Sequence, residues 1–285
     1  MATGSDKPNV PRNGTNGDAA EVGRVYVLPN LFTAGNLLCG FFALTWIFQF
    51  ESRHDLHLIQ RAIWLILAAF ACDFLDGRIA RLGGKESAFG REFDSLADLV
   101  SFGVAPAFLV YRIVLEEFPR TGWMVAAVYL ACGALRLARF NILSMRGVTS
   151  KEFVGFPIPS AAAMVVSVTL FMMWMAKKDI VTPVGTPEHP LGPYRWVLWV
   201  LMLLLSGLMV STIKYPTFKK IDWKLRESLA AFVGGLVVLF FGVQWPEVTL
   251  SLLFVCYMIY GMVRPWVSKR LRREIEIEEE DDEES

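Results

Sequence analysis

The sequence has few of the residues that build disulfide frameworks and zinc sites. It contains four cysteines and three histidines in 285 residues. The cysteines lie singly in apolar runs without CxxC spacing, which favours buried thiols over metal ligands or disulfides. The formal net charge is zero, so the chain lacks the basic excess of a nucleic-acid-binding protein. Residues 1–24 lack a basic segment followed by an apolar core, and we expect a disordered cytosolic leader rather than a signal peptide.

Apolar residues, in contrast, are abundant. They make up 54% of the sequence, with 21 Phe and nine Trp, a composition typical of membrane proteins. A helix needs about 20 apolar residues to cross a bilayer. Eight segments approach this length: Leu31–Phe50, Ala62–Arg81, Leu96–Leu115, Trp123–Ile142, Ile158–Ala176, Trp196–Ile213, Leu229–Val243 and Val248–Val263. Because lipid cannot satisfy exposed backbone groups and no segment alternates like a barrel strand, we expect an all-α, polytopic bundle of about eight transmembrane helices.

The distribution of lysine and arginine predicts how this bundle is oriented. With the amino terminus inside, the cytosolic loops and tail carry sixteen basic residues and the opposite side carries six. This bias, with an even number of spans, predicts that both termini are cytosolic. The last two spans are short and separated by four residues, so a tight helical hairpin is expected there. The expected location is the cell (inner) membrane.

Charge also divides the chain into three regions. Nine acidic residues lie within the last dozen positions, and the sequence before them carries a net charge of +9. We therefore predict a leader at 1–24, a membrane domain at 25–263 and a basic, then acidic cytosolic tail at 264–285. The tail either solvates the chain end or contacts a basic segment or partner.

Four aspartates lie where lipid would not tolerate them. Asp73 and Asp76 are three residues apart at the end of the second span, and Asp94 and Asp98 are four apart at the start of the third. Each spacing places two carboxylates on one helix face. Ionisable residues at membrane depth are candidates for function by default. Antiparallel neighbouring helices would direct all four carboxylates to one point near the cytosolic interface, beside a polar cleft.

Two divalent cations would neutralise such a cluster, because like charges at contact distance cannot all remain ionised without compensation. Oxygen ligands without histidine or cysteine favour Mg²⁺ or Mn²⁺ over Zn²⁺. The alternative is that the acids form ion pairs with Arg78, Arg81 and Arg91 and only hold the bundle together.

The acids and their neighbours resemble the signature of the CDP-alcohol phosphatidyltransferase family. Eight fixed positions over 26 residues match without departure: Asp73, Asp76, Gly77, Ala80, Arg81, Gly90, Asp94 and Asp98. The resemblance implies an integral membrane enzyme in which the first three aspartates bind two divalent metals that hold the diphosphate of a CDP-linked lipid. Asp98, beside the metals, would deprotonate the acceptor hydroxyl. The four non-acidic positions would line the cytidine-diphosphate site, and a homodimer is implied.

Residues 28–36, 136–141 and 155–159 further resemble the phosphatidylserine synthase branch of that family. This resemblance implies transfer of a phosphatidyl group from CDP-diacylglycerol to L-serine. Candidate acceptor-binding residues are Arg136, Arg139, Asn141 and Lys214, since a guanidinium recognises the carboxylate of serine bidentately. Both arginines would alternatively extend to anionic lipid headgroups.

Thr33 and Asn36, three residues apart on the first span, have two interpretations. They would hydrogen-bond the cytosine edge or a metal-bound water, or they would join neighbouring membrane helices. Two rival functions also stay open. Inositol phosphate or glycerol phosphate would replace serine in the same chemistry, or the acids would coordinate a transported cation. The clustering of the acids at one interface and the lack of an internal repeat argue against a transporter.

Overall fold

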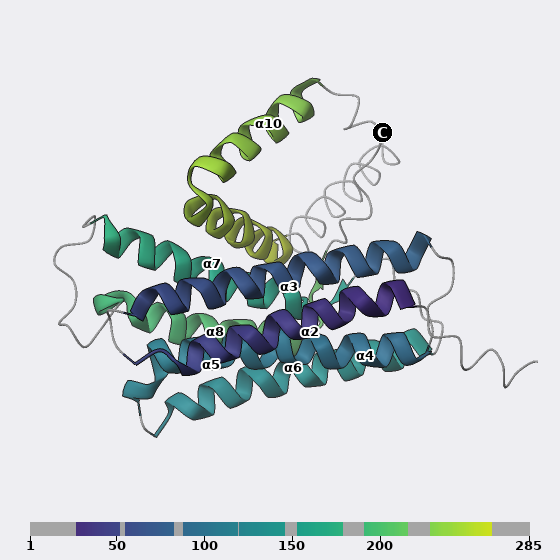
Figure 1. Ribbon diagram of the computed structural model, residues 1–285, viewed down its shortest axis with the longest axis horizontal. Coiled ribbons are helices and arrows are strands. Elements are labelled where there is room, and N and C mark those ends of the chain that lie inside the picture. The colour runs from purple at the N-terminus through teal and green to yellow at the C-terminus, as the bar shows by residue number, and fades with distance from the viewer. Residues whose placement is uncertain are drawn as a thin grey trace, which may run out of the picture.

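The computed structural model describes residues 27–51, 55–82, 88–118, 120–145, 153–178, 191–215 and 229–263. Its helices are α2 (Val27–Phe48), α3 (Leu56–Leu82), α4 (Ala88–Asp98), the π-helical η2 (Leu99–Val104), α5 (Ala105–Ile113), η3 (Leu115–Glu117), α6 (Gly122–Met145), α7 (Ile158–Lys177), η4 (Gly192–Arg195), α8 (Trp196–Val210), α10 (Leu229–Gln244) and the last helix, Pro246–Val263. Two short strands, β1 (Phe153–Val154) and β2 (Lys214–Tyr215), complete the described elements. Figure 1 shows α2 to α8 gathered in one bundle. The all-α fold is thereby confirmed.

Among the described residues, six helices are long and apolar enough to cross a membrane. They are Asn30–Phe48, Leu56–Ile79, Phe89–Ile113, Gly122–Ser144, Ile158–Lys177 and Pro246–Val263. Two shorter apolar helices, Trp196–Val210 and Val233–Gln244, occupy the remaining predicted positions. A multi-pass membrane protein is therefore supported. That all eight helices cross the bilayer, with both ends of the chain in the cytosol, stays a prediction.

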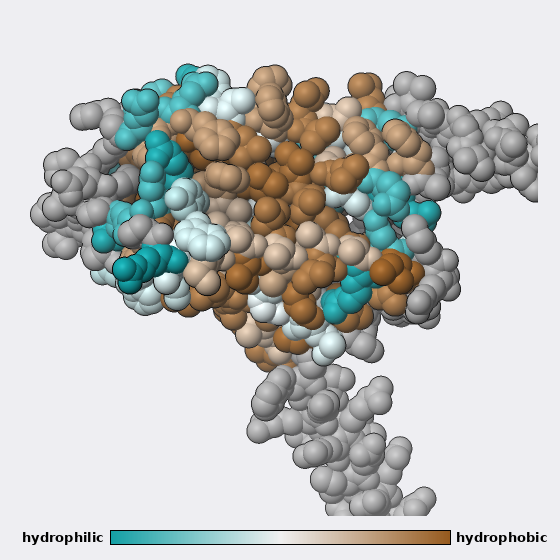
Figure 2. Space-filling view, turned by 90° about the horizontal axis from the view of Figure 1, so that it is seen from below, coloured by the Kyte–Doolittle hydropathy of each residue, from teal (hydrophilic) through white to brown (hydrophobic). Residues whose placement is uncertain are grey.

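The surface of the bundle has the apolar band expected of a lipid-facing protein. Figure 2 shows hydrophobic residues across the middle of one face, with hydrophilic residues toward its two ends. Large apolar side chains of α6 are exposed, among them Trp123, Val128 and Leu135. Exposed apolar side chains at this density would be unfavourable in water, whereas a hydrocarbon environment solvates them.

Two segments form the centre of the bundle. One is Phe89–Ile113, which comprises α4, η2 and α5, and the other is Ile158–Lys177. In each of them 61% of the most apolar 18 residues are buried, against 22–28% in the other four long spans. Small residues such as Ala161, Ala162 and Ala163 let neighbouring helices approach α7 closely. The helix that carries two of the four aspartates is therefore one of the most enclosed in the protein.

A π-helical turn follows Asp98 directly and lies against α2. Ser101 in η2 donates its hydroxyl to the carbonyl oxygen of Asn36, 2.8 Å away. Gly40 makes this approach possible, because a Cβ there would lie 2.8 Å from the Cα of Ser101. The close contact fixes α2 beside η2 and so places Asn36 next to Asp98. Such π turns occur often at functional sites.

The two short strands join the loops after α6 and α8. Phe153 pairs with Tyr215 and Val154 with Lys214 in an antiparallel ladder. Gly155 then adopts a φ of +83°, and its N–H donates to the carbonyl oxygen of Ile213 at 2.8 Å. Glycine is needed there because this φ disfavours other residues and because a Cβ would lie 2.8 Å from Nη2 of Arg139. The ladder is a local addition that the sequence pattern did not predict.

The carboxyl-terminal helices differ in how they meet the bundle. Figure 1 shows α10 projecting away from it, and large apolar side chains of α10 such as Leu239 and Phe240 are exposed. The last helix turns back at Trp245 and packs on the bundle through Phe254 and Met258, both buried. The predicted pair of short helices is present, but only its second member contributes to the core.

Two helices begin at least six residues earlier than the apolar pattern predicts. The second starts at Leu56 rather than Ala62, and the third starts at Ala88 rather than Leu96. A hydropathy pattern marks only the lipid-facing length, whereas backbone hydrogen bonds continue a helix through polar residues beyond it. As a result Asp94 lies inside a regular helix. The predicted leader at 1–24 and tail at 264–285 lie outside the described residues.

Candidate active site

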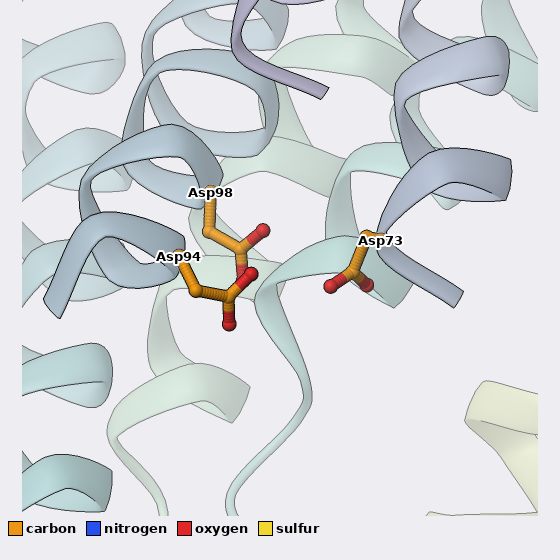
Figure 3. Close-up of side chains that lie close together, drawn as sticks. All are labelled: Asp73, Asp94 and Asp98. Carbon is orange, nitrogen blue, oxygen red and sulfur yellow. The ribbon is translucent and has the colours of Figure 1, made fainter. Parts of the chain in front are cut away.

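Three aspartates from two helices converge at one point. Asp73 projects from α3, and Asp94 and Asp98 project from α4. One carboxylate oxygen of each lies within 4.8 Å of those of the other two. Figure 3 shows the three carboxyl groups facing a common space between the helices. The spacing of four residues on α4 thus produces the shared face that the sequence predicts.

Asp76 has a different environment. It is buried at 7% exposure, and the group of three described above does not include it. Its carboxylate accepts a hydrogen bond from the Thr33 hydroxyl of α2. Of the four acids that the sequence predicts to form one cluster, three converge at one point. The fourth, Asp76, is hydrogen-bonded to Thr33 of α2. Thr33 and Asp76 connect the first two spans at the level of the site.

Asn36 holds the most enclosed acid of the group. Its Nδ2 donates to Oδ1 of Asp98 over 3.0 Å, and Asp98 is 6% exposed. Asn36 is itself fully buried and receives the Ser101 hydroxyl on its backbone carbonyl. The amide therefore fixes the rotamer of the Asp98 carboxylate from one side. The sequence left two interpretations of Thr33 and Asn36 open. In the structure both side chains donate hydrogen bonds from α2 to aspartates of neighbouring helices, and so join those helices.

The three converging carboxylates can all stay ionised only if positive charge lies near them. Asp98 experiences the negative charges of Asp73 and Asp94 and the positive charge of Arg136. Three carboxylates at this distance in a partly dry site repel one another strongly unless a cation lies among them. The ligands offered are all carboxylate oxygens, the donor set preferred by hard divalent ions such as Mg²⁺ and Mn²⁺. The residues thus fit a divalent metal site.

Arg136 on α6 is the positively charged neighbour of Asp98. It is 7% exposed, and its Nε has no hydrogen-bond partner among the described residues. Its guanidinium interacts electrostatically with Asp98 and Asp73. A buried guanidinium with donor capacity left is well suited to a carboxylate or phosphate ligand. This environment differs from that of an arginine extending to lipid headgroups.

Arg139, one helical turn later, donates hydrogen bonds to backbone carbonyl groups. Its guanidinium donates to the carbonyl oxygens of Val154 at 2.9 Å, Val210 at 3.2 Å and Ser211 at 3.3 Å. These carbonyls come from β1 and from the end of α8. Arg139 therefore ties α6 to β1 and to the end of α8.

The other predicted site residues have the following positions. Asn141 Nδ2 donates to the Ser95 hydroxyl on α4 at 2.9 Å, one residue after Asp94. Gly77 and Gly90 are half-buried, in α3 and α4 respectively. Ala80, Arg81 and Lys214 belong to α3 and β2 by their backbones, and their side chains lie outside the described part of the chain.

Residues that sequence reasoning did not single out also contribute. Ser101 and Gly40 set the approach of α2, and Ser95 receives Asn141. A serine and a glycine within apolar spans carry no local signal of such roles, because each contact depends on a helix far away in sequence.

Comparison with known proteins identifies the family. The model of the CDP-alcohol phosphatidyltransferase family matches residues 26–208, more than half of the chain. A relative from Helicobacter pylori strain J99 is 38% identical over 85% of this chain and 92% of its own length. A relative from Bacillus subtilis is 37% identical over 68% of this chain and 92% of its own length. One from Saccharomyces cerevisiae is 34% identical over 66% and 70%.

Each of these three relatives is named CDP-diacylglycerol–serine O-phosphatidyltransferase. The matched segment contains all eight signature positions and the three converging aspartates. The resemblance seen in the sequence is thereby confirmed, and this chain belongs to the CDP-alcohol phosphatidyltransferase family.

Proposed function

We propose that this protein transfers the phosphatidyl group of CDP-diacylglycerol to the hydroxyl of L-serine, giving phosphatidylserine and CMP. The observation that carries the proposal is the convergence of Asp73, Asp94 and Asp98 in a chain whose relatives are named for this reaction. The enclosed Asp98 and the neighbouring Arg136 provide, respectively, a base and a positive charge for an amino-acid acceptor.

The acidic residues provide the metal site of the reaction. We assign Asp73, Asp76 and Asp94, with Asp98 beside them, to two divalent ions, Mg²⁺ or Mn²⁺. Bound divalent ions would supply the charge that holds the diphosphate and stabilises negative charge on the phosphoryl oxygens and on the departing CMP. Thr33 keeps the Asp76 carboxylate in place through its hydroxyl. The convergence of oxygen ligands supports this assignment.

Asp98 is the proposed general base. Asn36 occupies its Oδ1, so Oδ2 is the atom assigned to accept the proton of the serine hydroxyl. A base must lie within hydrogen-bond reach of the proton that it abstracts and must be held in one geometry. The Asn36 amide and the Ser101 contact to Asn36 supply that second requirement.

The nucleotide is assigned to the signature positions between the acid pairs. Gly77 and Gly90 carry no side chain and let a flat ligand approach the backbone of α3 and α4. Ala80 and Arg81 complete this assignment, with the arginine pairing with phosphate. Because the lipid tails stay in the bilayer while CDP and serine come from water, we place the site at the cytosolic face of the cell (inner) membrane.

Arg136 is the residue that we assign to the carboxylate of serine. It is buried, lies beside Asp98 and has an Nε without a partner in the described structure. Arg139 has its guanidinium on three backbone carbonyls, so we assign it to holding the β1 and β2 loops. Asn141 and Lys214 are assigned to the same side of the site. By family resemblance the protein is proposed to act as a homodimer.

Replacing each arginine with lysine separates these two roles. Arg136→Lys should raise the KM for serine about tenfold with little change in the KM for CDP-diacylglycerol, because lysine cannot bind a carboxylate bidentately. Arg139→Lys should instead lower the free energy of unfolding by about 1–2 kcal/mol through loss of hydrogen bonds to carbonyls. Steady-state kinetics in detergent and thermal unfolding measure both effects. A raised serine KM with unchanged stability in Arg139→Lys would return acceptor binding to Arg139.

An acceptor panel tests the proposed reaction itself. The purified protein receives CDP-diacylglycerol, Mg²⁺ or Mn²⁺ and one radiolabelled acceptor at a time: L-serine, inositol phosphate or glycerol phosphate. Label should enter lipid from serine, and CMP should appear in equal amount. Label from inositol phosphate or glycerol phosphate alone would refute serine as the acceptor and retain the family chemistry. Omission of CDP-diacylglycerol serves as the blank.

A further inference from the structure

An amide side chain of α6 is hydrogen-bonded to the helix that carries two of the converging aspartates. Asn141 Nδ2 donates to the Ser95 hydroxyl oxygen over 2.9 Å, across 46 positions of the sequence. The same hydroxyl donates to the carbonyl oxygen of Arg91, one turn earlier in α4, at 3.1 Å. A serine hydroxyl has one proton, and here it goes to Arg91. Only the NH₂ group of Asn141 can therefore make the bond to Ser95, which fixes the orientation of the amide.

Ser95 lies next to the acids on α4 without being one of them. It follows Asp94 directly and precedes Asp98 by three residues. At 3.6 residues per turn, its side chain lies about 100° around the helix from Asp94 and about 60° from Asp98. A hydrogen bond at this angle involves neither carboxylate, but it resists rotation of α4 about its own axis. The direction in which both acids point therefore depends on it.

Two neighbouring helices hold α4 through amide side chains. On α2, which packs along α4, Asn36 donates to Asp98 over 3.0 Å. On α6, Asn141 donates to Ser95. The packing of α6 lies mainly against η2 and α5, which continue α4, and much less against α4 itself. Apolar contacts with α6 therefore do little to orient α4, and the hydrogen bond from Asn141 takes this role.

The end of α6 is itself fixed in place. Arg139, two residues before Asn141, donates to the carbonyl oxygens of Val154, Val210 and Ser211 over 2.9–3.3 Å. These bonds attach the last turns of α6 to β1 and to the end of α8. The Asn141 amide thus extends from a backbone that other elements hold, and it can serve as a fixed point for α4.

We propose that Asn141 is a positioning residue for the metal site and acts through Ser95 by fixing the rotation of α4. A divalent ion needs the oxygens of Asp73, Asp94 and Asp98 in one geometry, and functional groups tolerate errors of only about 10–20°. Without the bond, α4 can rotate and move its two acids relative to Asp73 on α3. Asn141 would then set the affinity for metal and would not bind the acceptor. This inference rests on the proposed function, which takes the acids as the metal site.

Direct binding of Mn²⁺ to the full-length protein in detergent tests the proposal. Electron paramagnetic resonance measures free Mn²⁺ with CDP-diacylglycerol present and serine absent, so that transfer to serine does not contribute. Asn141→Ala and Ser95→Ala should each raise the Kd for Mn²⁺ about fivefold, the effect of losing one net hydrogen bond. Ser95→Thr keeps the hydroxyl and should stay within about twofold of wild type. An unchanged Kd in either alanine variant would overturn the proposal, whatever its stability.

Ser206→Ala is the matched control. Ser206 on α8 is buried, and its hydroxyl donates to the carbonyl oxygen of Met202, one turn earlier, at 2.7 Å. The substitution thus removes a serine hydroxyl that is bonded within its own helix, as the hydroxyl of Ser95 is bonded to Arg91. It should leave the Kd for Mn²⁺ unchanged. A rise equal to that in Ser95→Ala would show that general loosening of the bundle weakens metal binding, and would refute the role of Asn141.

A double-mutant cycle tests whether Asn141 acts through Ser95. The double alanine variant should bind Mn²⁺ about fivefold more weakly than wild type, like each single variant, because both substitutions remove the same bond. A rise of about 25-fold, the product of two independent effects, would show that the residues act separately and would contradict the proposal.

The KM for serine separates metal positioning from acceptor binding. At saturating Mn²⁺ it should stay near wild type in Asn141→Ala, because the acids regain their metal. A raised serine KM with an unchanged Kd for Mn²⁺ would assign Asn141 to the acceptor instead. Failure of the proposed function looks different, because wild-type protein would then incorporate no serine in the acceptor panel. The Mn²⁺ measurement needs no serine and reports on the bond in either case.

Discussion

Replacing Asp98 with asparagine should reduce turnover by about 10²–10⁴-fold, the contribution of a positioned general base. Asparagine has nearly the shape of aspartate, and its Oδ1 can still accept the hydrogen bond from Asn36 that is 3.0 Å long in the native protein. The substituted amide cannot accept the proton of the serine hydroxyl at Nδ2. Binding of CDP-diacylglycerol should stay within a few-fold of wild type. Single-turnover kinetics and a separate lipid-binding measurement distinguish these effects.

Glu92→Gln is the matched control for this variant. Glu92 lies on the same helix, also carries a carboxylate and is exposed, so its neutralisation removes one charge without touching the convergent group. We expect kcat and both KM values to stay near wild type. Turnover near wild type in Asp98→Asn would remove the base role. Equal loss of lipid binding and turnover would instead indicate that Asp98 acts mainly on the metal site.

Helical periodicity was sufficient to predict the core of the site. Asp94 and Asp98 are four residues apart, and a helix places residues at this spacing on one face whatever surrounds them. Asp73 could be added because an antiparallel neighbouring helix returns to the same level of the membrane. The prediction thus needed only helical spacing and the short loop that joins the second and third spans. The observed convergence of the three carboxylates follows from them.

Contacts between distant helices were beyond such rules. The hydrogen bond from Thr33 to Asp76 spans 43 positions, and that from Asn36 to Asp98 spans 62. Their pairing depends on how far α2 slides along α3 and η2, which Gly40 and Ser101 determine through a close backbone approach. A pattern of apolar residues leaves this translation undetermined, since every register buries similar apolar surface.

The two arginines of α6 show the same limit on the acceptor side. Three residues apart, Arg136 and Arg139 share a helix face, and the sequence assigns both to an acceptor. The structure distinguishes them because the carbonyls of Val154, Val210 and Ser211 surround Arg139 and leave Arg136 beside Asp98. Backbone carbonyls have no sequence signature, so an arginine bound to them cannot be recognised from residue types.

Asp73→Asn should raise the concentration of Mg²⁺ or Mn²⁺ needed for half-maximal activity by at least about 10–100-fold. Losses of about this size follow when a residue that only hydrogen-bonds a metal ligand is replaced, so replacing a ligand itself should cost no less. The reason is electrostatic. Asp73 supplies one of the three converging carboxylates, and a neutral amide attracts a hard cation far less than a carboxylate does. Activity measured over a metal titration after chelation with EDTA gives this value.

The metal titration also separates metal binding from the base role. In Asp73→Asn, saturating metal should restore a large part of the turnover, because Asp98 and its Asn36 contact are intact. In Asp98→Asn, no metal concentration should restore it, since the missing group is a proton acceptor. Ion pairing of the acids with arginine predicts the opposite for Asp73→Asn, namely a loss of stability with an unchanged metal requirement. The shape of the two titrations thus decides between a metal site and a structural cluster in this membrane bundle.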